Sequence, residues 1–118
     1  MDTRNAILNY QYSEKMKSGL IIGTGLLEQV LSLKGEERSG GLKVLIGYLE
    51  GLLREVRIAM NVIGIEAYRP LEGRVMELVG WVQMSQFEEA RRSFAEAISS
   101  TTTLCQASMG YLMEKKLV

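Results

Sequence analysis

Apolar residues recur along most of this chain at intervals of three and four, the spacing that places them on one face of an α-helix. The clearest pattern runs from Leu42 to Ile63 and predicts a core-facing helix with a wide apolar stripe. The stripe consists of Leu42, Leu45, Leu49, Leu52, Val56, Ala59 and Ile63, and Ile46, Leu53 and Met60 widen it. Gly64, followed by Ile65, predicts a left-handed cap after this helix.

A second long helix is predicted after Ser85, which forms a capping-box pattern with Glu88. Its apolar and small positions are Phe87, Ala90, Phe94, Ala97, Thr101, Leu104, Ser108 and Tyr111. Residues 99–103 are all Ser or Thr, which are mediocre helix formers because their hydroxyls compete for backbone hydrogen bonds. We expect the helix to continue through this run, with a bend there as the alternative.

The remaining segments predict one further long helix and one short helix. The first should begin at Asp2 or Thr3 and end near 34–35, followed by a polar, glycine-rich loop over 36–41. A short helix opened by Pro70 fits between Gly64 and Ser85. Its apolar face is Leu71, Val75, Leu78, Val79 and Val82. Together these segments predict an all-α, antiparallel bundle of four helices, two or three of them long and one shorter, in a single domain over 1–118.

Composition narrows the function classes. The chain has 14 basic and 14 acidic residues, no His and one Cys, and 47% of its residues are hydrophobic. This balance excludes a disordered chain, a disulfide-stapled miniprotein and a nucleic-acid binder that relies on bulk positive charge. Cys105 has no partner for a disulfide and no basic neighbour, so we expect a buried, unreactive thiol in a cytoplasmic protein. No stretch fits a secretory signal or a membrane span.

The residues offer little for catalysis. Without His, the usual helical di-metal sites and every mechanism that needs imidazole are excluded. The glutamates form small clusters on predicted helix surfaces, and we interpret them as solvated faces; they are Glu36, Glu37, Glu50, Glu55, Glu88, Glu89 and Glu96. We therefore expect that the protein is not an enzyme and that it has no catalytic residue, no cofactor and no metal site.

Glycine placement is the least ordinary feature. Gly19 and Gly23, and likewise Gly47 and Gly51, stand four apart within predicted helices, where each interior glycine costs roughly 0.5–1 kcal/mol relative to Ala. Such pairs indicate either close packing of helix backbones or local kinks.

The helix over 42–63 also has a second, weaker apolar side opposite its main stripe. A helix that is apolar on most of its circumference is buried on two sides, either at the centre of a domain or at a subunit interface. We favour the interface and expect a homodimer or larger homo-oligomer. The candidate interface residues are Val44, Gly47, Tyr48, Gly51, Ile58 and Val62.

The function predicted from these features is a non-catalytic helical interaction or scaffold protein that self-associates through helix surfaces, with a further protein partner possible and no membrane partner. The alternative is a small nucleic-acid-associated subunit of a larger complex. That alternative requires the paired arginines to converge with the aromatic rings of Tyr68 and Trp81 on one exposed surface. Those arginines are Arg54, Arg57, Arg69, Arg74, Arg91 and Arg92.

Overall fold

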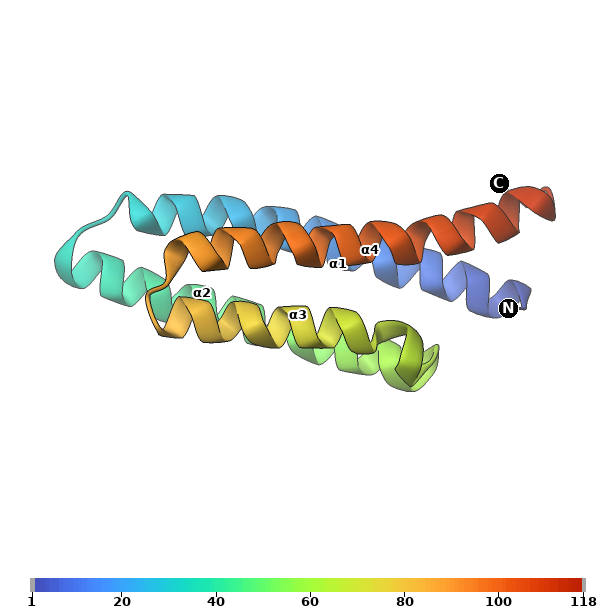
Figure 1. The fold of residues 1–118 in the computed structure, drawn as a ribbon, viewed down its shortest axis with the longest axis horizontal. Helices are drawn as coiled ribbons and strands as arrows, with labels where there is room; N and C mark the ends of the chain where they lie inside the picture. Colours follow the sequence, from blue (N-terminus) through green and yellow to red (C-terminus); the bar gives the residue numbers. More distant parts are fainter. Residues whose placement is uncertain (1, 118) are drawn as a thin grey trace.

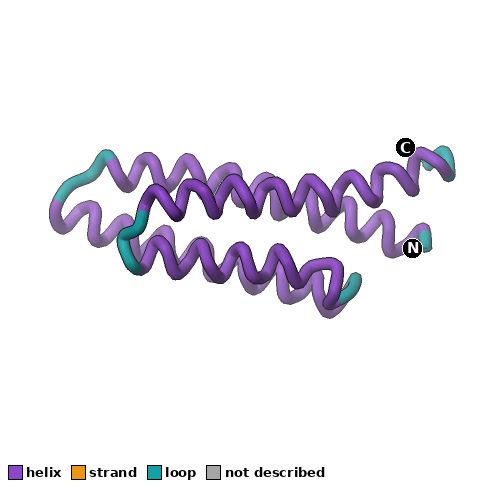
Figure 2. The backbone as a smooth tube through the Cα atoms, viewed as in Figure 1, coloured by secondary structure: helices purple, strands orange, loops and turns teal. Residues whose placement is uncertain are grey.

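The computed structural model describes residues 2–117 as four antiparallel helices joined by short turns, with no strand in that range (Figures 1 and 2). The helices are α1 (Thr3–Leu31), α2 (Gly35–Val62), α3 (Ile65–Gln83) and α4 (Phe87–Glu114). The predicted all-α bundle of three long helices and one shorter helix is confirmed. No described helix has a stretch that is both long and apolar enough to cross a bilayer.

Each helix packs against two neighbours, so that α1, α2, α3 and α4 form a closed ring around one core. The bundle is elongated, with extents of 54 × 22 × 18 Å. Both ends of the chain lie at the same end of the bundle, where α1 and α4 extend beyond the turn that joins α2 to α3 (Figure 1). The core residues follow the predicted stripes of α2, α3 and α4; they include Leu45, Leu49, Val56, Ala59, Leu71, Val75, Leu78, Val82, Ala90, Phe94 and Ala97.

The glycine pair of α1 is a site of close helix packing, as one of the two interpretations of the sequence predicted. A Cβ atom added to Gly19 would lie 2.7 Å from Leu52 Cδ2, and one added to Gly23 would lie 2.8 Å from Cε1 of the buried Phe94 ring. Both distances are shorter than a real Cβ contact. These glycines therefore let α2 and α4 approach the backbone of α1.

A buried polar layer near the termini ties α1 to α3 and α4. The Tyr68 hydroxyl donates to Asn9 Oδ1 at 2.7 Å, and Asn9 Nδ2 donates to the Leu104 carbonyl at 2.8 Å and to the Ser108 hydroxyl. Within the described residues, no buried side-chain polar atom lacks a hydrogen-bond partner. In this part of α1 the polar Asn9 is buried, while the nearby Ile7 is 41% exposed.

The first turn of α2 corrects the predicted loop. Helix α1 ends at Leu31, earlier than expected, and α2 already begins at Gly35, inside the segment expected to be polar loop. The Arg38 guanidinium donates to the Leu31 and Leu33 carbonyls, which the end of α1 leaves free. Gly41 packs against Val30, which lies 3.1 Å from its added Cβ position. Tertiary contacts thus stabilise a glycine-rich turn of helix that intrinsic propensity disfavours.

Both predicted caps around α3 are wrong, and so is its expected start. Gly64 is extended rather than left-handed and stands at the N-terminal boundary of α3, so Pro70 lies inside the helix instead of opening it. Ser85 does not cap α4; it takes a left-handed conformation (φ 57°) at the end of α3. The Gln86 N–H donates to the Trp81 carbonyl at 2.9 Å and the Ser85 N–H to the Val82 carbonyl at 3.1 Å, which together form a Schellman motif.

The Ser/Thr run does not interrupt α4, so the expected continuous helix is confirmed. Four of its hydroxyls donate to carbonyls one turn earlier, at 2.6–3.2 Å; they belong to Ser100, Thr101, Thr102 and Thr103. These bonds satisfy the hydroxyls within the helix itself.

Candidate interaction surface

The second apolar side of α2 lies on the outside of the bundle. Val44 is 74% exposed, more than any other large hydrophobic residue of the described chain. Ile58 and Val62, farther along the same side, are 45% and 41% exposed. The core of this small bundle is completed by the other stripe of α2, so these side chains have no place in it.

The glycines on this side of α2 do not pack against their own chain. No atom lies within 4 Å of a Cβ added to Gly47, and Gly51 has only the side chain of Arg54, from its own helix, at 3.8 Å. Of the two sequence interpretations, close packing within the chain therefore holds for α1 and not for α2.

Tyr48 differs from the other five candidate interface residues, because it already has an intrachain role. Its side chain is half-buried and its hydroxyl donates to the Gly19 carbonyl at 2.7 Å, so that the ring lies over Gly19 and Gly23 of α1. Burial raises the pKa of its phenol. Tyr48 forms the boundary between the core and the exposed side of α2.

One residue that the sequence interpretation missed extends this surface onto α1. Ile22 is 57% exposed. It lies level with Tyr48, since the Tyr48 ring covers the preceding and following glycines of α1. Its signal in the sequence was its position, which falls off the three-and-four spacing of the buried Met16, Leu20 and Leu27.

We call these residues the outer α1/α2 face: Ile22, Val44, Gly47, Gly51, Ile58 and Val62. An ion pair between Lys15 and Glu55, at 3.1 Å, crosses from α1 to α2 within it and separates Ile58 and Val62 from the rest. On α3 and the turn after it, by contrast, the most exposed hydrophobic side chains are the flexible Met76 and Met84. The outer α1/α2 face is thus the aliphatic, β-branched side of the bundle.

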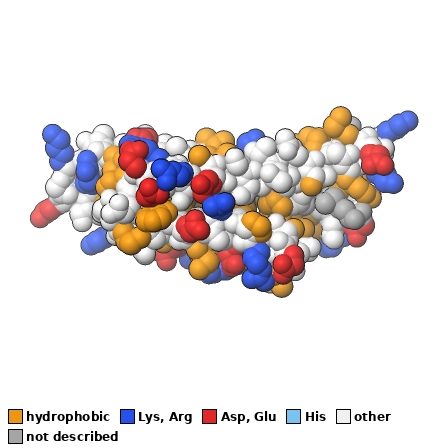
Figure 3. Space-filling model, viewed as in Figure 1, with side chains coloured by type: hydrophobic (Ala, Val, Ile, Leu, Met, Phe, Trp, Pro, Cys, Tyr) orange, Lys and Arg blue, Asp and Glu red, His pale blue; other side chains and the backbone are white. Residues whose placement is uncertain are grey.

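The residues required for a nucleic-acid surface do not converge. Tyr68 is fully buried in the polar layer and presents no ring for stacking on a base. Five of the six arginines form ion pairs with glutamates; they are Arg57, Arg69, Arg74, Arg91 and Arg92. On the side that α3 and α4 present, basic and acidic side chains lie interspersed (Figure 3).

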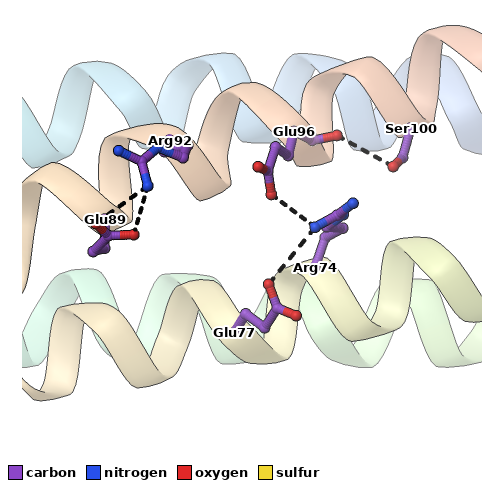
Figure 4. A network of polar contacts seen from close by, with 6 residues as sticks. All are labelled: Arg74, Glu77, Glu89, Arg92, Glu96 and Ser100. Carbon is purple, nitrogen blue, oxygen red and sulfur yellow. Dashed lines mark hydrogen bonds and ion pairs between the residues drawn. The ribbon is translucent and has the colours of Figure 1, made fainter.

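A groove of about 370 Å³ between α3 and α4 illustrates this pairing. Arg74 lies between Glu96, at 2.7 Å, and Glu77, at 3.8 Å, and Arg92 pairs with Glu89 at 3.0 Å (Figure 4). Three carboxylates accompany the two guanidinium groups, so the groove carries no excess of positive charge that would attract an anion. We interpret this network as a polar clamp between the two helices.

The single thiol is held in its protonated form. Cys105 Sγ donates to Glu14 Oε1 at 2.9 Å. Burial, together with the hydrogen bond to this carboxylate and its negative charge, raises the pKa of Cys105. Such a thiol is a poor nucleophile. Among residues 2–117, no three acidic or cysteine side chains gather in a metal-binding arrangement.

Comparisons with protein-family models, with curated proteins and with solved structures find no match for this chain. The outer α1/α2 face is therefore interpreted from its own geometry.

Proposed function

We propose that this protein is a non-catalytic helical interaction module that self-associates, as a homodimer or larger homo-oligomer, through the outer α1/α2 face. The observation that carries the proposal is the 74% exposure of Val44 on a helix whose other side completes the core. Fully burying a side chain such as Val or Ile contributes roughly 1.5–3 kcal/mol, so covering this face is favourable. The single free thiol of the protein supports action in a reducing compartment such as the cytoplasm.

The stiffness of the residues on this face supports an interface. The β-branched Val44, Ile22 and Ile58 have restricted χ1 rotamers, so burying them against a partner costs less conformational entropy than burying flexible side chains. The neighbouring Gly47 and Gly51 leave room for a partner to approach the α2 backbone.

The test is the mass of the protein in solution. Wild type, Val44→Glu and Met76→Glu are compared by sedimentation velocity and light scattering from about 1 to 100 μM. Met76, 51% exposed on α3, is the matched control. We expect wild type and Met76→Glu to associate and Val44→Glu to be monomeric with unchanged helicity. A wild type that is monomeric throughout the range would overturn the proposal.

The alternative function, a nucleic-acid-associated subunit, is not favoured, because Tyr68 is buried and the arginines lie among glutamates rather than in one basic patch. Filter binding with single-stranded RNA over a salt series distinguishes the two. Phosphate recognition would give binding that weakens steeply with salt, whereas we expect none at physiological ionic strength.

A further inference from the structure

The outward side of α2 carries a second seam with coiled-coil spacing. Alternating steps of three and four residues lead from Glu37 through Gly40, Val44, Gly47 and Gly51 to Arg54. We call these six residues the α2 seam. All of them lie in α2 and none is part of the core. Such spacing keeps one line of residues facing a partner helix over several turns.

Beside the α2 seam lies a row of four charged residues whose signs alternate. These charges are seven residues apart and therefore lie on one flank of the helix; they are Glu36, Lys43, Glu50 and Arg57. Each of the first three directly precedes a residue of the α2 seam, and the fourth precedes Ile58, which continues the spacing of the seam. Within the described chain, the first three form no ion pair, and Arg57 is 50% exposed although it contacts Glu72 of α3. Charges in this flanking position set partner choice and orientation in coiled coils.

We infer, on the basis of the proposed function, that the partner is a second copy of this chain whose α2 lies antiparallel across α2, with the two-fold axis between Val44 and Gly47. In an antiparallel pair, the residues on this flank face the same flank of the other helix. Glu36 then faces Arg57 of the partner subunit, and Lys43 faces Glu50 of the partner subunit. By symmetry each contact occurs twice, so four complementary pairs line the interface.

The same register fits the α2 seam. Val44 lies opposite Gly47 of the partner subunit, so the most exposed aliphatic side chain meets a position with open space. Gly40 lies opposite Gly51 of the partner subunit, which permits close approach of the backbones. Glu37 lies opposite Arg54 of the partner subunit, which adds an ion pair at each end.

Parallel pairing of α2 lacks this complementarity. In a parallel pair, each flanking charge faces the residue five positions farther along the other helix. Lys43 would then face Tyr48 of the partner subunit, and Glu50 would face the like-charged Glu55 of the partner subunit. The alternating charges therefore select the antiparallel arrangement.

Charge reversal at one pair tests this register. Lys43→Glu and Glu50→Lys are made separately and studied alone and as an equimolar mixture by sedimentation. Each single variant places two like-charge pairs in its homodimer, so we expect its dissociation constant to rise on the order of tenfold. In the mixture, both pairs of the heterodimer are complementary again, so association should return to near the wild-type value.

The control pair is Lys115→Glu and Glu114→Lys, which make the same change in net charge at the end of α4, a helix that does not contact α2. These variants, alone or mixed, should associate as wild type does. A wild type that dimerises while the single variants do so equally well, or fail to recover on mixing, overturns the antiparallel register and leaves self-association standing. A monomeric wild type overturns both.

Discussion

The two glycine pairs of this bundle have the same spacing and opposite surroundings. In α1, Gly19 and Gly23 are covered by Leu52, Tyr48 and Phe94 of the same chain, and an added Cβ atom would collide with Leu52 or with Phe94. In α2, Gly47 has nothing within 4 Å and Gly51 only a side chain of its own helix. Only the first pair has a structural explanation within the monomer.

This difference teaches how to interpret a small residue within a helix. Both pairs lower helix propensity by a similar amount, and in α1 the lost propensity is offset by packing that no larger residue would permit. In α2 the monomer gains nothing in return, and the exposed Val44 lies between Gly40 and Gly47. An interface with a second molecule would explain why α2 keeps two glycines that lower its helix propensity next to an exposed aliphatic residue.

The largest expected effect is at the packed pair. Gly23→Ala should lower the free energy of unfolding by about 2 kcal/mol, because its Cβ would lie 2.8 Å from the Phe94 ring, which is 1% exposed and packed in the core. Chemical denaturation followed by circular dichroism measures the change. A variant as stable as wild type would show that α1 and α4 can separate at this point without cost.

A smaller loss of stability is expected in the polar layer, which is also buried within the monomer. Tyr68→Phe removes a donor and leaves Asn9 Oδ1 without its bond from Tyr68, so it should cost about 1–2 kcal/mol at neutral pH.

The same substitution predicts a change in pH dependence. Burial, and secondarily the nearby Tyr12, raise the pKa of the Tyr68 phenol above its ordinary value of 10.0. A raised pKa in the folded state means that stability is full below the unfolded pKa and declines as pH rises above it. Wild type should therefore lose stability above about pH 10 more steeply than Tyr68→Phe. Chemical denaturation between pH 8 and 11 measures this, and an equal pH dependence of the free energy of unfolding in both proteins would contradict it.

The smallest effect has the opposite sign and lies at the open pair. Gly47→Ala should stabilise the monomer by roughly 0.5–1 kcal/mol, since Ala is the better helix former and the added methyl meets no atom of its own chain. Thermal unfolding at a concentration below the association range measures it. Sedimentation at higher concentration should show weaker association, because the methyl occupies the space proposed for Val44 of the partner subunit. Destabilisation of the monomer would remove the contrast between the two glycine pairs.

The sequence predicted the parts of the fold that depend on periodicity. The stripe of α2 identified its buried Leu45, Leu49 and Val56, and the small-and-large alternation of α4 placed Ala90 and Phe94 in the core. Hydrophobic burial follows helical spacing directly. The burial of these residues can therefore be predicted without knowing which helices pack beside them.

The boundaries depended on tertiary contacts and were predicted less well. Residues 36–41 look like a loop until Arg38 is seen to bind the carbonyls at the end of α1. Ser85 looks like an N-cap because its spacing to Glu88 is right, yet it closes α3 instead. Local patterns of this kind serve either side of a turn, and only the packing of both helices decides between them.

The candidate surface was predicted in part. Val44, Ile58 and Val62 are exposed on α2 as the second apolar side requires. The packing of Tyr48 onto α1 and the addition of Ile22 depend on which side of α1 faces α2, and the periodicity of one helix contains no information about that.

The polar layer also fixes an order of events during synthesis of the chain. Asn9 forms hydrogen bonds with Leu104 and Ser108, which lie 95 and 99 residues farther along the chain. Gly23 likewise packs against Phe94, which belongs to α4. A growing chain can pack α1 against α2 and α2 against α3. The side of α1 that contacts α4 stays uncovered until α4 has been synthesised. Of these four helices, α1 is thus made before the others but completed only with α4.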